Sequence, residues 1–116
     1  MSQRGDRSYL DDAIGAIDAA MGFVAGHTKG SLEDDEQCLS AVLYKLTVLG
    51  EALARVSPAT RAAHPDLPWR YAIAPRNRVV HQYADVDVDI VGQTVQTDLP
   101  SLRSSLQRVA AGLADP

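Results

Sequence analysis

Three stretches of this sequence carry apolar residues at intervals of three and four positions, and this spacing restricts the fold more than any other feature. In the first stretch, residues 6 to about 26, the apolar positions are Leu10, Ile14, Ile17, Met21 and Val24. Because an α-helix completes one turn every 3.6 residues, these positions form one stripe along a helix face. The sequence therefore predicts an amphipathic helix that ends at the glycine-flanked residues 26–30.

A second helix is predicted to begin at Ser31, which forms a capping-box pattern with Asp34, and to run to Val56. Its apolar positions are Leu39, Val42, Leu43, Leu46, Leu49, Leu53 and Val56. Ser57 and Pro58 then stop this helix or cap the next one. Residues 58–64 are long enough for a short helix, because proline is tolerated in a first helical turn.

The third apolar stretch predicts a last helix whose cap is Asp87. Its apolar positions are Ile90, Val91, Val95, Leu99, Leu102, Leu106, Val109 and Leu113. Pro100 lies within this stretch, and proline removes a backbone donor from a helix. We therefore expect a bend or a break near Pro100.

Composition also indicates a helical protein. The 116 residues are 46% hydrophobic but only 5% aromatic, and the β-branched and aromatic runs that mark strands are scarce. This length leaves room for one domain over residues 1–116. The sequence has no run of 18 apolar residues, and residues 1–7 are polar where a signal peptide would turn apolar. We expect one all-α domain in the cytoplasm, without membrane contact.

The charge of the chain is unevenly distributed. The net charge of −4 argues against a general polyanion binder, which usually carries a basic excess. Residues 55–81, however, hold five arginines against one acid, Asp66, so this segment is +4 while the rest of the chain is −8. Ordinary solvated faces would explain this pattern, but a basic segment also suits a site that handles phosphate.

Several classes of site lack support in the sequence. It contains no P-loop, no dinucleotide-binding glycine pattern, no His-Glu-x-x-His motif and no pair of cysteines. Cys38 has no Cys or His neighbour at metal-ligand spacing, so we expect it on a helix face or in the core. His27 is expected to be a solvent-exposed loop histidine, and His64, which precedes a proline, to be structural.

One stretch of eight residues, 76–83, gathers several reactive side chains: Arg76, Asn77, His81 and Tyr83. On a helix Arg76 and Tyr83 lie seven positions apart, nearly one above the other, and Asn77 and His81 share a neighbouring stripe. A partly buried helix in which Asn77 and His81 satisfy each other would also explain the pattern. Pro75 precedes the stretch, so either the helix is kinked there or a new helical turn begins.

The pattern Arg-Asn-x-x-x-His-x-Tyr resembles the signature of the HEPN superfamily, in particular the HepT-like toxins. The resemblance extends to Gly50-Glu51-Ala52, Leu67-Pro68-Trp69, Asp98-Leu99-Pro100 and Leu102, in the family's order and spacing. Trp69 is expected to be a core anchor ahead of the signature. Glu51 is either an exposed carboxylate or a structural partner of a signature arginine. The resemblance implies a HEPN-type bundle of four to five helices that forms a symmetric dimer.

Chemically, an imidazole beside a guanidinium suits metal-free RNA cleavage, in which the 2′-hydroxyl attacks the adjacent phosphate. His81 would move the proton and Arg76 would stabilise the charge on the transition state, with Asn77 and Arg78 in support. This reaction needs no cofactor and no metal. Only RNA carries the required hydroxyl, so the expected substrate is RNA and not DNA.

The resemblance implies further properties. It implies a homodimer through the motif helix, and a type II or VII-like toxin–antitoxin pair with a minimal nucleotidyltransferase as the antitoxin. It also implies that this partner transfers AMP to Tyr83 and so blocks the site. The alternative hypothesis is a non-catalytic HEPN module that binds a nucleotide, RNA or a protein partner through the same cleft.

Overall fold

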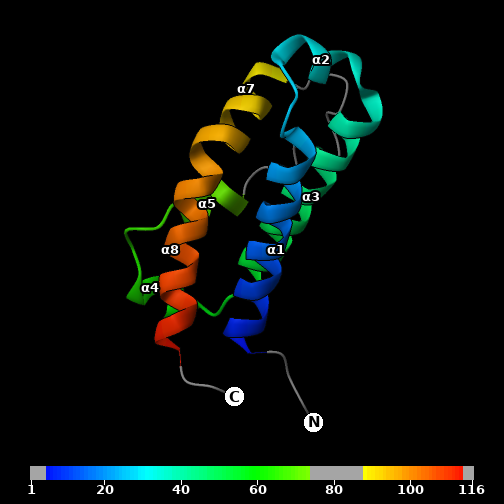
Figure 1. Cartoon of the computed structure of the whole chain (residues 1–116). Coiled ribbons are helices and arrows are strands. Elements are labelled where there is room, and N and C mark those ends of the chain that lie inside the picture. Colours follow the sequence, from blue (N-terminus) through cyan, green and yellow to red (C-terminus); the bar gives the residue numbers. More distant parts are fainter. Residues whose placement is uncertain (1–4, 74–87, 114–116) are drawn as a thin grey trace.

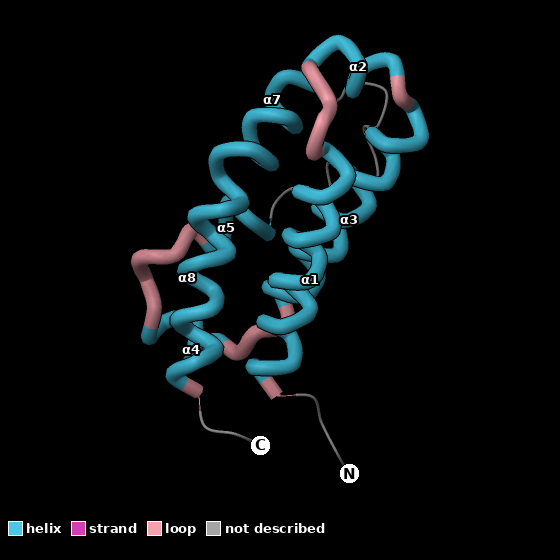
Figure 2. The backbone as a smooth tube through the Cα atoms, viewed as in Figure 1, coloured by secondary structure: helices cyan, strands magenta, loops and turns pink. Residues whose placement is uncertain are grey.

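The computed structural model describes residues 5–73 and 88–113, and every described element is helical (Figures 1 and 2). In chain order they are α1 (Asp6–Val24), α2 (Lys29–Asp34), α3 (Glu36–Ala54), α4 (Pro58–Ala63), α5 (Trp69–Ile73), α7 (Val88–Gln93), the π-helical turn η2 (Thr94–Asp98) and α8 (Leu99–Gly112). The predicted all-α class is confirmed. None of the described helices is both long and apolar enough to span a lipid bilayer.

The core forms where α1, α3 and the α7–η2–α8 segment pack side by side. In Figure 1 α1 runs antiparallel to α3, and α8 also runs antiparallel to α1. The predicted stripes supply the largest fully buried side chains of this core, which are Leu10, Ile17, Val42, Leu43, Leu53, Val56, Val95 and Leu106. Ala13, Ala16 and Ala20 of α1 are buried as well. Their small side chains let the neighbouring helices approach closely.

The segment after α1 differs from the prediction. The helix expected from Ser31 to Val56 is two helices, because α2 ends at Asp34 and α3 begins at Glu36. The N-cap of α2 is Thr28, whose side chain accepts from the Ser31 N–H, while the Thr28 N–H donates to Ser31 Oγ. Ser31 is therefore the third residue of the helix and not its cap. Asp35 instead caps α3, where its Oδ1 accepts from the Cys38 N–H at 3.0 Å.

The C-terminal stripe forms one continuous helical segment from Val88 to Gly112, in which η2 lies directly before Pro100. At the end of η2 the Leu99 N–H donates to the carbonyl of Thr94, five residues back. A proline ring clashes with the carbonyl four residues before it, and the wider π-helical turn makes room for the ring. The expected bend or break is thus a π-helical turn. Ile90, expected in the apolar stripe, is instead 61% exposed.

At the end of the bundle where α1 begins, Asp6 joins α1 to α4. Its carboxylate accepts from the Ser57 N–H at 2.9 Å, from the Ser57 hydroxyl at 2.6 Å and from the Thr60 hydroxyl. Ser57 also caps α4, as the sequence predicted, with Pro58 in the first turn. Burial alone would raise the pKa of Asp6, but the bonds from Ser57 and Thr60 outweigh it and lower the pKa below its ordinary value.

We predict that the stability provided by Asp6 depends on pH. Because the pKa of Asp6 is lower in the folded chain than in the unfolded chain, its stabilising effect is complete above about pH 4 and is lost as the pH falls through the folded value. Asp6→Asn should therefore lower the free energy of unfolding by about 1–2 kcal/mol at neutral pH. Urea denaturation at pH 7 and at pH 3 measures the difference, which should shrink at pH 3.

Asp11→Asn is the matched control, since Asp11 is an exposed acid on the same helix. It should change the unfolding free energy little at either pH. If Asp6→Asn destabilised the protein equally at both pH values, the charged hydrogen bonds would not be the source of the effect.

Candidate functional site

The signature lies between two described elements. Residues 74–87 fall outside the described residues, and with them the predictions for Pro75, Asp87 and the signature side chains Arg76, Asn77, Arg78, His81 and Tyr83. The chain enters this segment from α5 and leaves it into α7. α5 packs on α3, whereas α7 packs on α2 and continues directly into η2. Both elements that flank the signature in the chain therefore belong to the packed bundle.

Trp69 anchors the entry to the signature, as the sequence predicted. Its side chain is only 9% exposed and belongs to the hydrophobic core. The indole N–H donates to the backbone carbonyl of His64 at 2.9 Å, so the one polar atom of the ring has a partner. His64 is also the C-cap residue of α4, which supports its predicted structural role. The loop between α4 and α5 is thus closed around the indole.

A second contact joins α5 to the C-terminal segment. The Tyr71 hydroxyl donates to Asp98 Oδ2 at 3.2 Å, and Asp98 is the last residue of η2. Asp98 is one of the residues that carried the family resemblance, and Tyr71 lies five positions before Arg76 in the sequence. This exposed hydrogen bond links the helix before the signature to the π-helical turn that follows α7.

Two of the three arginines that the structure describes in the basic segment are exposed. Arg55 and Arg70 are exposed and Arg61 is half-buried, while Arg76 and Arg78 fall outside the described residues. Glu51 is exposed, and its two predicted roles stay open, because the signature arginines with which it would pair lie outside the described residues. Two arginines outside the basic segment have described partners. Arg103 hydrogen-bonds to Asp18, and Arg108 hydrogen-bonds to Ser105, which also lies on α8. Arg55 and Arg70 therefore offer positive charge to solvent on the elements before the signature.

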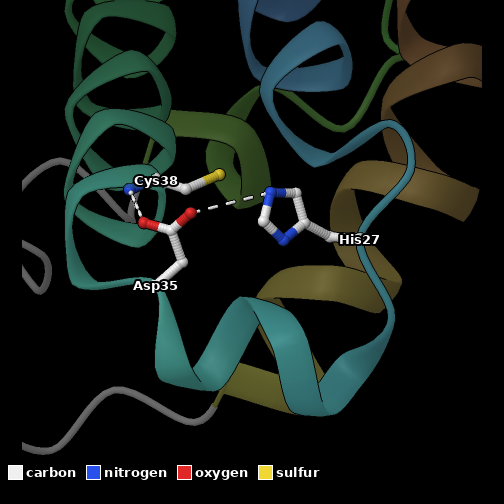
Figure 3. A group of neighbouring side chains, drawn as sticks. All are labelled: His27, Asp35 and Cys38. Carbon is white, nitrogen blue, oxygen red and sulfur yellow. Dashed lines mark hydrogen bonds and ion pairs between the residues drawn. The ribbon is translucent and has the colours of Figure 1, made fainter.

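A group of side chains at the other end of the bundle was not predicted. His27, Asp35 and Cys38 gather there, and one ligand atom from each lies within 4.8 Å of the other two (Figure 3). His27 lies in the loop after α1, as predicted, but its side chain is half-buried and not fully exposed. Burial raises the pKa of the Cys38 thiol and the nearby Asp35 charge adds to the effect. A thiol that stays protonated at neutral pH is a poor nucleophile.

Comparison with known proteins finds a family whose matched region includes the signature. A family model described as "Ribonuclease HepT-like" matches residues 13–109. The chain is similar to "Probable ribonuclease HepT" of Thermococcus cleftensis, with 29% identity over 107 residues that cover 92% of this chain and 97% of that protein. It is 23% identical over 115 residues to "Putative RNase MJ0125" of Methanocaldococcus jannaschii, covering 99% of each. No solved structure matches the chain.

Proposed function

The chain belongs to the HepT-like ribonuclease family, since that family's model matches residues 13–109, and on this premise we propose that it is a metal-independent endoribonuclease toxin. One observation carries the proposal: the full pattern Arg76-Asn77-x-x-x-His81-x-Tyr83 stands inside the matched region. The ribonuclease names of the relatives support the same class of activity. The exposed Arg55 and Arg70 support an approach by a polyanion.

In the proposed reaction RNA supplies its own nucleophile. The 2′-oxygen attacks the neighbouring phosphorus, the bond from phosphorus to the 5′-oxygen breaks, and the 2′-hydroxyl proton passes to His81. Arg76 stabilises the negative charge that develops on the phosphoryl oxygens. The products are a 2′,3′-cyclic phosphate and a 5′-hydroxyl, whose proton comes from a second acid or from water. Asn77 and Arg78 orient the imidazole and the phosphate.

The second acid is the reason for proposing a homodimer. One signature offers one imidazole, whereas cleavage of this kind uses one group to accept a proton and another to donate one. A two-fold symmetric pair of motif helices places two copies of His81 at one cleft. Each copy of the chain would then supply half of the site.

Neutralisation by AMP transfer is the second part of the proposal. A cognate minimal nucleotidyltransferase is the proposed antitoxin. The Tyr83 phenol oxygen attacks the α-phosphorus of ATP, pyrophosphate leaves, and the phenol proton is lost to the enzyme or to water. Because Tyr83 lies seven positions from Arg76, a helical signature places the added phosphate on the arginine's face. The anionic adduct would occupy the position of the RNA phosphate.

We predict that two substitutions in the signature stop RNA cleavage without unfolding the chain. His81→Ala removes the proton acceptor and should lower the cleavage rate by about 100- to 10,000-fold. Arg76→Ala removes the charge stabilisation and should lower it by about 100- to 1,000-fold. Both are measured by gel electrophoresis of a labelled RNA in the presence of EDTA, with circular dichroism to verify the helical fold.

The matched controls are His64→Ala and Arg108→Ala, which replace the same residue types outside the signature. Both should cleave RNA at nearly the wild-type rate. Equal RNA loss with all five proteins would identify a contaminating nuclease. RNA binding without cleavage by the wild-type protein would favour the non-catalytic module instead.

We also predict that co-expression with a cognate minimal nucleotidyltransferase adds AMP to Tyr83. Intact-mass measurement of the wild-type chain should show the mass of at least one AMP, and the modified chain should not cleave RNA. Tyr83→Phe should show no added mass. Tyr44→Phe is the control, because Tyr44 is a 63% exposed phenol on α3 that should not affect the reaction. Modification of Tyr83→Phe to the wild-type extent would place the acceptor elsewhere.

A further inference from the structure

The end of the bundle where α1 ends and α3 begins brings together three potential metal ligands. His27 follows α1, Asp35 lies between α2 and α3, and Cys38 is in the first turn of α3 (Figure 3). We propose that His27 Nε2, an Asp35 carboxylate oxygen and Cys38 Sγ bind one zinc-class transition-metal ion. This inference does not rest on the proposed ribonuclease activity.

The local backbone explains how His27 reaches this position. Gly26 adopts a φ of 84°, in the left-handed region that glycine enters without the strain a side chain would cause. This turn reverses the chain, so that the His27 N–H donates to the carbonyl of Val24 at 2.9 Å. The imidazole then points toward the start of α3, where Asp35 and Cys38 lie (Figure 3).

The distances between the ligand atoms suit a tetrahedral ion. Zinc binds nitrogen and oxygen at about 2.0–2.2 Å and sulfur at about 2.3 Å, so atoms that share a tetrahedral ion lie roughly 3.3–3.8 Å apart. His27 Nε2 lies 3.8 Å from Asp35 Oδ2, and the three ligand atoms all lie within 4.8 Å of one another. Side-chain rotations that move atoms by roughly 1 Å would complete the geometry.

A hydrogen-bond chain orients the imidazole for metal binding. Ser31 Oγ donates its hydrogen to the carbonyl of Thr28 at 3.2 Å. Because the hydroxyl hydrogen of Ser31 is already used, the His27 Nδ1–H is the donor in the 3.1 Å contact between His27 Nδ1 and Ser31 Oγ. In the neutral ring the unprotonated Nε2 then directs its lone pair at the Asp35 carboxylate, and these two electron-rich groups repel each other. A cation bound between them would remove this repulsion. Metal-bound histidines commonly donate their second ring N–H in this manner.

The types of ligand select the class of ion. Magnesium and calcium prefer all-oxygen sites, whereas a set of imidazole, carboxylate and thiolate suits zinc, cobalt and related ions. The Cys38 thiol donates to the carbonyl of Phe23 at 3.1 Å, and metal binding would replace the thiol proton and release it. The side chains of His27 and Asp35 are 24% and 43% exposed, which leaves a path for the ion and for water as a fourth ligand.

Such an ion would clamp the end of α1 to the start of α3. It would also hold α2, because Asp35 directly follows α2 and because Ser31 of α2 holds the imidazole. α2 packs on α7, the element into which the signature segment leads. The consequence of binding is therefore a more stable bundle at this end. The proposed catalysis at the signature does not use the ion.

Cobalt(II) titration of the full-length, EDTA-dialysed protein tests the proposal. Wild-type protein should give a near-ultraviolet thiolate-to-cobalt charge-transfer band at one equivalent, and zinc should displace it while magnesium should not. The melting temperature should rise with zinc concentration, because the ion binds the folded chain. His27→Ala and Cys38→Ser should each weaken binding by about tenfold or more, and Cys38→Ser should abolish the charge-transfer band.

Two further variants separate ligation from folding. Asp35→Asn keeps a side-chain oxygen that caps α3 but removes the charge, so it should fold normally and bind cobalt more weakly. His64→Ala replaces a histidine outside the group and should bind as the wild type does. Absence of binding at micromolar free cobalt, or an unchanged charge-transfer band in Cys38→Ser, would overturn the proposal. RNA cleavage is not a readout in this experiment, so its outcome is independent of the proposed activity.

Discussion

The rest of the structure depends on the packing of α1 against α3. The two helices run antiparallel, and each buries an apolar stripe whose central members, such as Ile17 and Leu43, are almost completely removed from water. Burying one such side chain contributes about 1.5–3 kcal/mol, so a few pairs outweigh any single surface contact in the molecule. The η2–α8 part of the C-terminal segment packs a third apolar face against α1. Every other described element is attached to that three-part core.

Polar contacts then determine how the ends of the core are held. Asp6 ties the start of α1 to α4, while Cys38 contacts the last turns of α1 through the Phe23 carbonyl. Between these ends, Trp69 anchors the helix that leads into the signature. A reactive segment benefits from this arrangement, because groups that must meet a substrate with sub-ångström accuracy need rigid elements on both sides. The proposed activity and the described scaffold are consistent in this respect.

Much of this fold could be predicted from the sequence. The three stripes contain the largest fully buried side chains of the described residues, because a spacing of three and four follows from helix geometry and burial, although Ile90 of the third stripe is exposed. The start of α2 was predicted wrongly because two hydroxyl residues, Thr28 and Ser31, both fit a cap and only their mutual hydrogen bonds decide between them. The π-helical turn before Pro100 was expected only as a bend or break. Local packing, which a single sequence does not report, decides which form of distortion relieves the proline clash.

The grouping of His27, Asp35 and Cys38 could not be predicted for a different reason. Metal-site motifs are recognised by short spacing within one element, whereas His27 and Cys38 are separated by the whole of α2. The positive φ of Gly26 and the split between α2 and α3 bring them together. The one hint in the sequence was the glycine before His27, because glycine marks chain reversals. The signature is the reverse case: it is recognised from its spacing in the sequence, whereas its side chains lie outside the described residues.

The central claim is that this chain cuts RNA by attack of a 2′-hydroxyl without a metal, and one substrate tests it directly. An RNA oligonucleotide is first mapped for its cleavage position, and the nucleotide on the 5′ side of that position is then replaced by its 2′-deoxy form. In EDTA the unmodified oligonucleotide should yield a 2′,3′-cyclic phosphate end, and the substituted one should remain intact at that position. Cleavage of both at equal rates, or no cleavage until a divalent metal is added, would contradict the account.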